Sequence, residues 1–352
     1  MGRKPTKNFN LPPRMRAMRK SSGKIYYYHD AGMQPDGSRP YNPLGANFID
    51  ALRQYAELET NATQPVITFP EAVSQFQIEE LAKKAHTTQK DILWSLPNLL
   101  DFFGNPPAPL DQIKPIHIRQ YLDRRGKAAP TRANREIAWF SVIFNWSRNK
   151  GFTEAPNPCA GIKRHREKGR SIYVHDDDLA TLKEHADAPL CDAIDLAYLT
   201  GQRPADVLKM QETNIRDGAL EIRQNKTGMP IRIAVVGELA KVIERCKLRK
   251  DKLPIHTHYL LTNEEGQKLT KSMLRGRFER VRAAAAAVAK DEETAMRIRA
   301  IQFRDLRAKA ATDKADIAGD IRQAQEQLGH TSVSMTEHYV RQRRGKKVTP
   351  TK

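Results

Sequence analysis

The feature that most constrains the fold is a change of pattern near the middle of the chain. Between residues 69 and 149, apolar residues recur at helical spacing in successive segments. The stretch NPCAGIKRHREKGRS, residues 157–171, then breaks this periodicity with Pro158, Gly161 and a cluster of basic residues. Beyond it the pattern is mixed, with a predicted hairpin among helices. A chain built in this way is expected to fold as several units joined by a linker, because one core does not grow to this size.

The chain is strongly basic, which predicts a polyanionic partner. Its 60 Lys and Arg against 41 Asp and Glu give a formal net charge of +19, so nucleic acid is the first candidate. Acidic membrane lipid would also attract this charge. However, no apolar stretch has the length of a spanning helix and the amino terminus lacks an apolar signal core, so we expect a soluble intracellular protein with no membrane partner.

Cysteine usage predicts neither a disulfide framework nor a zinc knuckle. The three cysteines, Cys159, Cys191 and Cys246, are scattered without CxxC spacing. The histidines outside the motifs described below also lack the spacing of metal ligands. We therefore expect no metal and no cofactor.

The first region, residues 1–62, is predicted to be a small α+β domain. Its first 24 residues contain basic side chains and no acid, which is typical of a segment that binds phosphate or stays solvated. A β-prone run, Ile25 to Tyr28, follows, then turn-forming residues and a helical stretch over 47–58. The candidate DNA-contacting residues in this region are Arg3, Lys4, Arg14, Arg16, Arg19 and Lys20.

The second region, residues 65–165, is predicted to be entirely helical. In its last helix, over 131–149, Ile137, Phe140 and Phe144 form the expected buried side. The helix residues Arg132, Asn134 and Arg135 are expected to point away from that core. Lys163 and Arg164 belong to the basic cluster of the linker. A solvated basic face is the ordinary interpretation, and we predict DNA contact for Arg132, Arg135, Lys163 and Arg164 because of the neighbouring motifs.

Three segments in the last region, residues 166–342, stand out together. They are TGQRPADVLKM (200–210), FRDLRAKAAT (303–312) and LGHTSVSMTEHY (328–339). Each alone is weak evidence, because such arginines are usually surface groups and such a tyrosine is usually packed. Between the first two, strands over 220–224 and 231–236 are predicted to form a hairpin whose turn contains Lys226. The order and spacing of these segments raise their significance.

This constellation resembles the tyrosine site-specific recombinases, and more closely their bacteriophage, lambda-integrase-like branch. The family's catalytic set runs arginine, hairpin lysine, His-x-x-Arg, Leu-Gly-His and tyrosine. The counterparts here are Arg203, Lys226, Arg304 with Arg307, His330 and the nucleophile Tyr339. The resemblance is specific in the carboxy-terminal half and weaker before it.

The resemblance implies a multidomain, mainly α protein with small β elements. Residues 1–62 would be an arm-type DNA-binding domain, 65–165 a SAM-like helical core-binding domain, 166–342 a mixed α/β catalytic domain and 343–352 a basic tail. The implied partners are double-stranded DNA with core-type and arm-type sites, further copies of the chain in a homotetramer, and accessory DNA-bending proteins. The implied location is the cytoplasm or nucleoid of a bacterial host.

The residue types suit the chemistry that the resemblance implies. A tyrosine hydroxyl, with an ordinary pKa of about 10, is a poor nucleophile unless its neighbours assist it. Arg203 and Arg307 are suited to hold the charge that develops on a phosphodiester under attack. His330 could hydrogen-bond the same oxygens or accept the tyrosine proton, and Lys226 could protonate the departing 5′ oxygen. The resulting 3′-phosphotyrosyl bond conserves the energy of the phosphodiester, so rejoining needs no ATP.

One departure from the family pattern leaves alternatives open. Arg304 stands where the family usually has histidine, and arginine is a poor general base. Proton removal could pass to His330, Arg304 could add a third positive contact to the phosphate, or it could simply pair with Asp305 or Asp313. Asp206 occupies a position where the family has an acid, and either orients a basic neighbour or forms a helix-surface salt bridge.

The leading prediction is an integrase that inserts or excises a mobile element. A Xer-like resolvase or invertase would use the same chemistry, but such enzymes generally lack an amino-terminal arm domain. A type IB topoisomerase would share the phosphotyrosine step without exchanging strands between partners. A DNA-binding regulator with an impaired recombinase fold is the alternative that the substitution at Arg304 favours.

Overall fold

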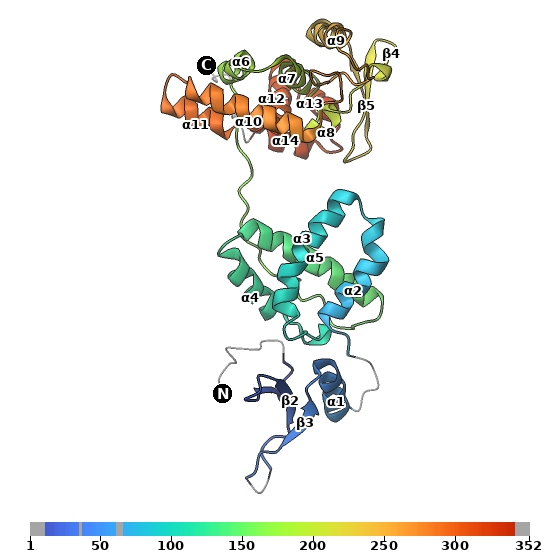
Figure 1. The fold of residues 1–352 in the computed structure, drawn as a ribbon, viewed down its shortest axis with the longest axis vertical. Helices are drawn as coiled ribbons and strands as arrows, with labels where there is room; N and C mark the ends of the chain where they lie inside the picture. The colour runs from blue at the N-terminus through green and yellow to red at the C-terminus, as the bar shows by residue number, and fades with distance from the viewer. Residues whose placement is uncertain (1–10, 35–36, 61–65, 342–352) are drawn as a thin grey trace, which may run out of the picture. The chain divides into compact units, whose positions relative to one another are not determined.

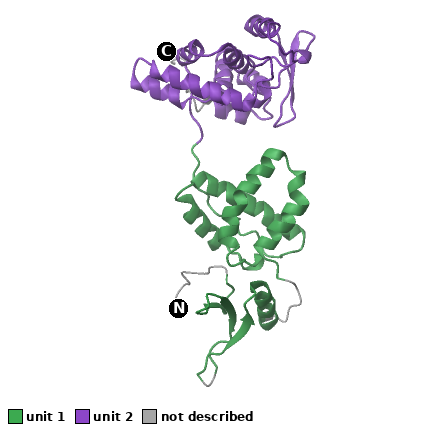
Figure 2. Ribbon diagram, in the orientation of Figure 1, with its two compact units in different colours: residues 1–168 green, residues 169–352 purple. Residues whose placement is uncertain are grey.

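In the computed structural model, which describes residues 11–34, 37–60 and 66–341, the chain divides into two compact units. They span residues 1–168 and 169–352 (Figure 2). Figure 1 shows helices in both units and one small sheet in each, so the predicted multidomain, mainly α fold with small β elements is confirmed. The basic tail predicted over 343–352 lies outside the described residues.

The amino-terminal unit begins with a three-stranded antiparallel sheet in the order β1–β2–β3, followed by one helix. Met15, Tyr27 and Leu44 from the sheet pack with Phe48 and Leu52 of the helix in a small hydrophobic cluster. The sheet and helix predicted for residues 1–62 are therefore present in the described part of that region. The element bounds are β1 Met15–Arg19, β2 Ile25–Asp30, β3 Tyr41–Gly45 and α1 Phe48–Thr60.

The rest of this unit is a helical module with its own hydrophobic cluster, which includes Phe69, Phe103 and Phe140. The two clusters share no residue. The subdivision of residues 1–168 at residues 62 and 65 stays a prediction, although this separation of the clusters agrees with it. The element bounds are α2 Phe69–Glu80, η1 Leu81–Lys83, α3 His86–Phe103, η2 Leu110–Gln112, α4 Pro115–Gly126 and α5 Pro130–Asn149.

Part of the predicted linker is packed onto this helical module. Asn134 of α5, expected to point away from the core, is only 3% exposed. Its side-chain amide donates to the carbonyl of His165, 2.9 Å away, and to Glu167, 2.8 Å away, while its oxygen accepts the His165 amide proton at 3.0 Å. The polar side chain is buried because it satisfies the backbone of a segment without regular secondary structure. The predicted linker therefore begins with a fixed segment.

The carboxy-terminal unit surrounds one large hydrophobic cluster with helices and a second three-stranded sheet, in the order β4–β5–β6. Strands β5 and β6 pair from Ala219 with Ala234 to Arg223 with Pro230, so the predicted hairpin is present, with each strand beginning one residue earlier than predicted and the second strand one residue shorter. The element bounds are α6 Asp176–Glu184, α7 Ala188–Thr200, α8 Pro204–Val207, η3 Glu212–Asn214, β4 Ile215–Arg216, β5 Ala219–Arg223, β6 Pro230–Ala234, α9 Gly237–Lys250, α10 Lys271–Ala287, α11 Glu292–Ala300, η4 Phe303–Asp305, α12 Leu306–Ala318, α13 Ile321–Leu328 and α14 Val333–Arg341.

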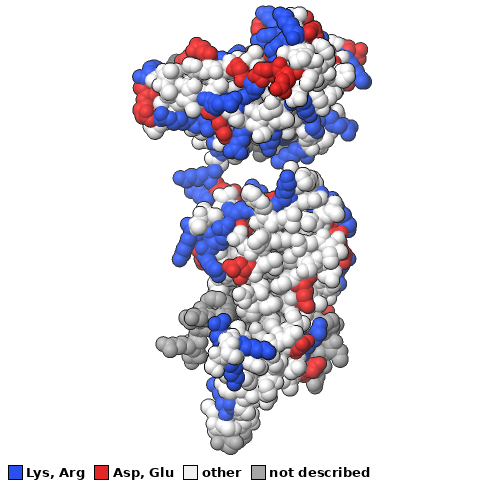
Figure 3. Space-filling view, in the orientation of Figure 1, with Lys and Arg blue, Asp and Glu red and all other residues white. Residues whose placement is uncertain are grey.

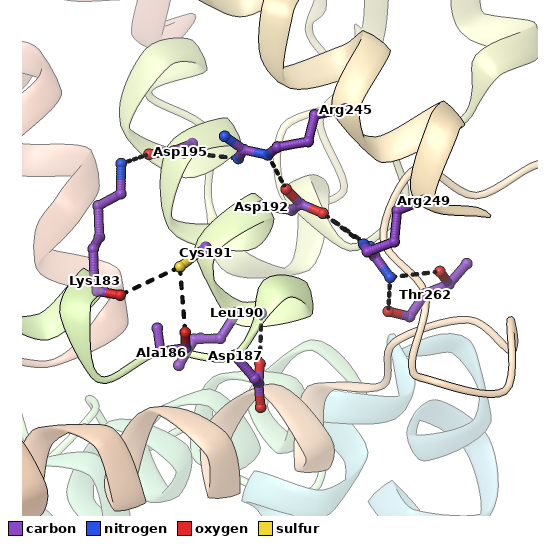
Figure 4. Close-up of polar contacts among 10 residues, drawn as sticks. All are labelled: Lys183, Ala186, Asp187, Leu190, Cys191, Asp192, Asp195, Arg245, Arg249 and Thr262. Carbon is purple, nitrogen blue, oxygen red and sulfur yellow. Dashed lines mark hydrogen bonds and ion pairs between the residues drawn. The ribbon is translucent and has the colours of Figure 1, made fainter. Parts of the chain in front are cut away.

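Ion pairs anchor α7, the helix that leads into the first motif. Figure 4 shows Asp192 and Asp195 of α7 facing Arg245 and Arg249 of α9. The Arg245 guanidinium donates to Asp192 at 2.7 Å and to Asp195 at 2.8 Å, and Arg249 donates to Asp192 at 3.0 Å. Because Asp192 is buried, these paired donors offset the cost of removing its charge from water. The helix that ends just before Arg203 is thereby held in place.

A second buried network anchors α12, which carries the second motif. The ammonium of Lys309 is buried between Asp176 and Asp313. The hydroxyls of Tyr173 and Tyr198 also donate to Asp313, at 2.7 and 2.9 Å. This network links the start of the unit and α7 to the helix that begins beside Arg307.

Candidate active site

A cavity of roughly 380 Å³ in the carboxy-terminal unit brings together residues from distant parts of the sequence. Among the predicted site residues, Arg203, Arg304, Arg307 and Tyr339 line it. The remaining lining residues are Arg170, Pro204 and His338. A cavity surrounded by guanidinium groups beside a phenol is suited to bind an anion such as a phosphate.

Arg203 reaches the cavity from the segment between α7 and α8. Its Nη1 donates to Oε1 of Gln224 across 2.9 Å. Gln224, only 1% exposed, also donates from Nε2 to Gln202, 2.8 Å away, and to the carbonyl of Leu328, 2.8 Å away. The same Oε1 accepts from the hydroxyl of Thr227 at 2.9 Å. Gln224 therefore links the first arginine, the hairpin turn and the segment before His330.

Arg307, at the start of α12, is 3% exposed and is held by backbone carbonyls. Its Nη1 donates to Gly201 at 2.8 Å and its Nη2 to Leu328 at 2.7 Å. Burial, and then the nearby charge of Arg203, lower the pKa of Arg307 to about 10. The group is still charged at neutral pH, and two carbonyl bonds fix its plane.

His330 is 8% exposed and lies between Arg307 and Thr336. Nη2 of Arg307 is 3.1 Å from Nε2 of His330, and Nδ1 is 3.0 Å from the Thr336 hydroxyl. A guanidinium has only donors, so Nε2 must accept and the imidazole proton is assigned to Nδ1. Burial, followed by the charges of Arg307 and Arg203, lowers the pKa of His330 to about 4. The imidazole is therefore neutral at neutral pH.

Tyr339 is half-buried on α14 and reaches the cavity beside His330. The centroids of the two rings are 5.5 Å apart and the ring planes are inclined by 34°. Helix α14 packs against both α12 and α13, which carry Arg307 and lead to His330. The side chain is therefore not sealed in the hydrophobic core, as an ordinary packed tyrosine would be.

Of the predicted catalytic residues, His330 does not itself line the cavity but contacts Arg307, which does. Lys226 does not line the cavity either. It is exposed in the turn between β5 and β6. This turn is anchored nearby, because Oδ1 of buried Asp206 accepts the backbone N–H of Asn225 at 2.8 Å. Of the two interpretations of Asp206, orientation of a neighbour thus has support, although the neighbour is a backbone amide. A role for Lys226 stays a prediction that requires its flexible side chain or the turn to approach the cavity.

Arg304 is exposed and lines the cavity, while the two carboxylates proposed to pair with it are engaged elsewhere. Asp305 binds Arg170, with its shortest contact at 2.6 Å, and Asp313 binds Lys309 at 2.9 Å. Within the described residues, Arg304 forms an ion pair with neither. The interpretation of Arg304 as a simple ion-pair partner therefore loses support, and the two roles that involve a phosphate or His330 remain.

Three contributors to the site escaped the sequence analysis. Gln224 and Thr336 orient predicted residues, but nothing in their residue type distinguishes them from ordinary polar residues. Arg170 was grouped with the basic linker, although its side chain lines the cavity. The only available signal was its place at the end of a cluster of basic residues, which indicates charge and not direction.

The predicted DNA-contacting residues fall into several groups. In the described part, Arg19, Lys20, Arg135, Lys163 and Arg164 are exposed. Figure 3 shows Lys and Arg side chains distributed over the visible face of both units, with acidic groups among them. Arg3 and Lys4 lie outside the described residues.

Other arginines in that prediction are engaged in internal contacts. Arg132 donates to Asp91 at 2.7 Å and to Ser95 at 2.7 Å, so its guanidinium joins α5 to α3, and its DNA contact stays a prediction that these bonds do not support. Arg14 pairs with Glu59 at 2.9 Å and Arg16 with Asp30 at 3.3 Å, although about half of each arginine side chain stays exposed. These two could still meet a phosphate, but with part of their charge already neutralised.

Neither a metal site nor a membrane span is found in the described part of the chain. This part contains no group of three His, Cys, Asp or Glu side chains arranged to hold a metal ion. None of its helices is both long enough and apolar enough to cross a membrane.

Comparison with known proteins places this geometry in context. Residues 173–345 match the model of the phage integrase family. The chain is 28% identical to the integrase of Enterobacteria phage 434 over 251 residues, which is 67% of this chain and 65% of that protein. It is likewise 28% identical to the integrase of Escherichia phage lambda over 245 residues, with the same two shares. The aligned part thus spans about 65% of the length of these relatives.

A further relative and two solved structures extend the comparison. The tyrosine recombinase XerC of Thermodesulfovibrio yellowstonii is 25% identical over 266 residues, 69% of this chain and 82% of that protein. A lambda integrase tetramer bound to a Holliday junction superposes with a TM-score of 0.67 at 18% identity, covering 97% of this chain and 98% of that one. A lambda integrase dimer bound to a core site gives 0.68 at 19% identity, with coverage of 97% and 99%. These structures share the fold.

Proposed function

We propose that the protein is a site-specific DNA recombinase, because residues 173–345 match the model of the phage integrase family. It cleaves and rejoins DNA strands through a covalent 3′-phosphotyrosyl bond at Tyr339, and so integrates or excises a mobile element. The observation that carries this proposal is the convergence of Arg203, Arg307 and Tyr339 on one cavity.

The cavity supplies positive charge where the reaction develops negative charge. When the Tyr339 oxygen attacks phosphorus, charge grows on the nonbridging oxygens of the phosphodiester. Arg203 and Arg307 present guanidinium forks that are already oriented by Gln224 and by backbone carbonyls. Such preorganised donors stabilise the transition state without rearranging during the reaction.

His330 is suited to accept the Tyr339 proton because it is neutral. Its Nε2 lone pair is occupied by Arg307 in the structure, and becomes free when a phosphate draws that guanidinium into the cavity. The proton on Nδ1 is retained by the bond to Thr336. In this scheme Arg304 is a further cation for the phosphate, and no general base is needed at its position.

The leaving group and the return step complete the reaction. The P–O5′ bond breaks as the P–O bond to Tyr339 forms, and the ammonium of Lys226 donates a proton to the departing 5′ oxygen. A free 5′-hydroxyl from a partner duplex then attacks the phosphotyrosyl bond, which restores the phosphodiester and the tyrosine. The phosphodiester bond and the phosphotyrosyl bond have nearly equal energies, so neither step needs ATP.

The assembly follows from the same proposal. The protein binds double-stranded DNA at core-type sites through residues 66–341 and at arm-type sites through the amino-terminal sheet, with accessory DNA-bending proteins bringing the sites together. Lambda integrase, which shares the fold, has been solved as a tetramer on a Holliday junction, and this supports a homotetramer here. The enzyme acts in the cytoplasm of a bacterial host.

A resolvase similar to XerC is the second candidate, and the similarity to the XerC of Thermodesulfovibrio yellowstonii favours it. The two functions differ in their DNA sites. An integrase recombines an element's site with a different chromosomal site, whereas a resolvase acts on two copies of one site. Recombination of paired plasmids carrying each arrangement separates them, and the sheet and helix at the amino terminus favour the integrase.

A nicked suicide duplex tests the cleavage step. The duplex carries the sequence at the junction of the integrated element, with a nick that lets the short 5′-hydroxyl fragment diffuse away after attack. The native protein is expected to accumulate a covalent adduct that resists denaturation in SDS, and Tyr339→Phe to form none while still binding the duplex. Tyr198→Phe, which removes a hydroxyl outside the cavity, is the control. An adduct with Tyr339→Phe, or none with the native chain, overturns the proposal.

A further inference from the structure

Arg170 forms an unusually complete ion pair at the edge of the cavity. Its Nε lies 2.8 and 3.0 Å from the two carboxylate oxygens of Asp305, and its Nη2 lies 2.6 Å from one of them. The same Nη2 donates to the carbonyl of Ala300. This fork-to-carboxylate geometry is the strong form of an ion pair, because two donors meet two acceptors in one plane.

Asp305 itself is 1% exposed and belongs to the segment that presents the site arginines. It is the last residue of η4, follows Arg304 directly and lies two positions before Arg307. Its Oδ2 also accepts the backbone N–H of Gln302 at 2.8 Å, which fixes the start of this turn. The carboxylate thus has a structural role within a segment whose arginines face the cavity.

Unless a partner neutralises it, a buried carboxylate at this place would compete with the DNA phosphate for the arginines of the cavity. Opposite charges in contact attract several times more strongly near a protein than in bulk water, because the effective dielectric constant is lower there. Without Arg170, Asp305 would draw a guanidinium from the cavity, and Arg304 is the nearest along the chain. That arginine would then be lost to the phosphate, because one guanidinium fork cannot serve both anions at full strength.

We propose that Arg170 is a positioning residue for strand cleavage, which occupies the Asp305 carboxylate and so keeps Arg304 and Arg307 available to the DNA phosphate. This inference rests on the proposed function. Arg170 lies shortly after Glu167, whose carboxylate accepts a hydrogen bond from Asn134 of α5. The chain that leaves the helical module therefore supplies the guanidinium that pairs with Asp305. The pair therefore makes the end of the linker part of the active site.

The test compares Arg170→Ala with the double variant Arg170→Ala/Asp305→Asn on the nicked suicide duplex. Adduct formation is measured in a single turnover at saturating protein, and duplex affinity is measured separately. Arg170→Ala is expected to slow adduct formation between about tenfold and a hundredfold, with affinity changed far less, because a misplaced charge costs more in the transition state than in binding. Removing the carboxylate charge as well is expected to restore the rate to within about threefold of the native protein.

Arg297→Ala is the matched control. Arg297 binds the buried Asp178 with the same two-donor geometry, at 2.7 and 2.8 Å, in the same unit but away from the cavity. It is expected to lower the unfolding temperature as Arg170→Ala does, while adduct formation by its folded fraction stays at the native rate. Equal slowing by both variants would mean that the effect comes from lost stability.

The outcomes separate this inference from the proposed function. If the native protein forms the adduct and Arg170→Ala forms it equally fast, only the role of Arg170 is wrong. A double variant as slow as Arg170→Ala, or slower, would likewise show that Arg170 does not act by neutralising Asp305. If the native protein forms no adduct, both proposals are wrong.

Discussion

Nη2 of Arg307 donates a hydrogen bond to Nε2 of His330 across 3.1 Å, and the opposite ring nitrogen is bonded to Thr336. This chain of contacts sets the charge and the tautomer of the imidazole at once. A cation at Nε2 disfavours a second positive charge on the ring, and Thr336 retains the proton on Nδ1. The site therefore contains a neutral proton acceptor surrounded by permanent cations.

The first prediction concerns stability at mildly acidic pH. Burial and the two arginines lower the pKa of His330 to about 4, below its ordinary value of about 6.5. As the pH falls through 6.5 the unfolded chain gains a proton at this residue and the folded chain does not, so the free energy of unfolding decreases until about pH 4. Between pH 7 and pH 5 this contributes a loss of about 2 kcal/mol.

Denaturant unfolding at several pH values checks this contribution. His330→Gln should remove it, so the difference in unfolding free energy between the native protein and this variant should shrink as the pH falls. His185→Gln, at an exposed position on the same unit, controls for loss of a histidine elsewhere. Parallel pH profiles for the native protein and His330→Gln would contradict the lowered pKa.

The second prediction concerns Gln224, whose side-chain oxygen accepts a hydrogen bond from Arg203. Gln224→Ala removes the acceptor for Arg203 and one of the two side-chain donors to the carbonyl of Leu328, which keeps its bond to Arg307. We expect single-turnover adduct formation to fall by roughly a hundredfold, because even small displacements of a phosphate-binding group are costly. Glu221→Gln, on strand β5, which ends at Arg223 just before Gln224, should leave the rate within about twofold of the native value. Native-like cleavage by Gln224→Ala would mean that Arg203 needs no such support.

The third prediction uses two glycines with the same backbone conformation. Gly329 has φ +62° and Gly319 has φ +65°, so alanine is strained at either position by about 1 kcal/mol. A Cβ at Gly329 would also approach Cδ1 of Ile231 at 2.7 Å and Nε2 of Gln224 at 3.1 Å, whereas one at Gly319 meets nothing within 4 Å. Gly329→Ala should therefore lose about 1 to 3 kcal/mol more than Gly319→Ala in denaturant unfolding. Equal losses would show that the side chains of Ile231 and Gln224 move away from an added Cβ at little cost in stability.

The fourth prediction separates DNA-contacting arginines from structural ones. Each phosphate contact contributes about 0.9 to the slope of log K against log salt, so Arg19→Ala/Lys20→Ala should reduce the slope by up to about 2 on a mixed-sequence duplex. Arg132→Ala should leave the slope unchanged, because its guanidinium binds Asp91 and Ser95. That variant should instead lose about 2 kcal/mol of unfolding free energy. Binding isotherms at several salt concentrations distinguish the two patterns, and a reduced slope for Arg132→Ala would contradict its structural role.

Local chemistry made several parts of the molecule predictable. The turn formers between residues 225 and 230 predicted the hairpin, and helical spacing predicted the helices of the amino-terminal unit, because both depend on neighbours a few residues apart. The family resemblance carried by Arg203, Arg307 and His330 implied a phosphate-handling site, since the residues that carry a resemblance can be read from the chain itself.

Periodicity was less informative about individual side chains. The spacing of α5 predicted which face is apolar, but not that Asn134 would be buried against the linker or that Arg132 would be tied to Asp91. Both contacts join residues more than thirty positions apart. A polar side chain is buried when a distant partner satisfies it, and no pattern within one helix identifies that partner.

Sequence by itself determined the elements, the charge and the identity of the groups that could meet a phosphate, because these follow from residue type and short-range spacing. Tertiary packing alone decided that Arg170 neutralises Asp305, that Gln224 accepts a hydrogen bond from Arg203, and that His330 is neutral with its proton on Nδ1. The physical reason is that hydrogen bonding and charge depend on burial and on partners up to 140 residues away along the chain. Only the folded chain brings those partners within reach.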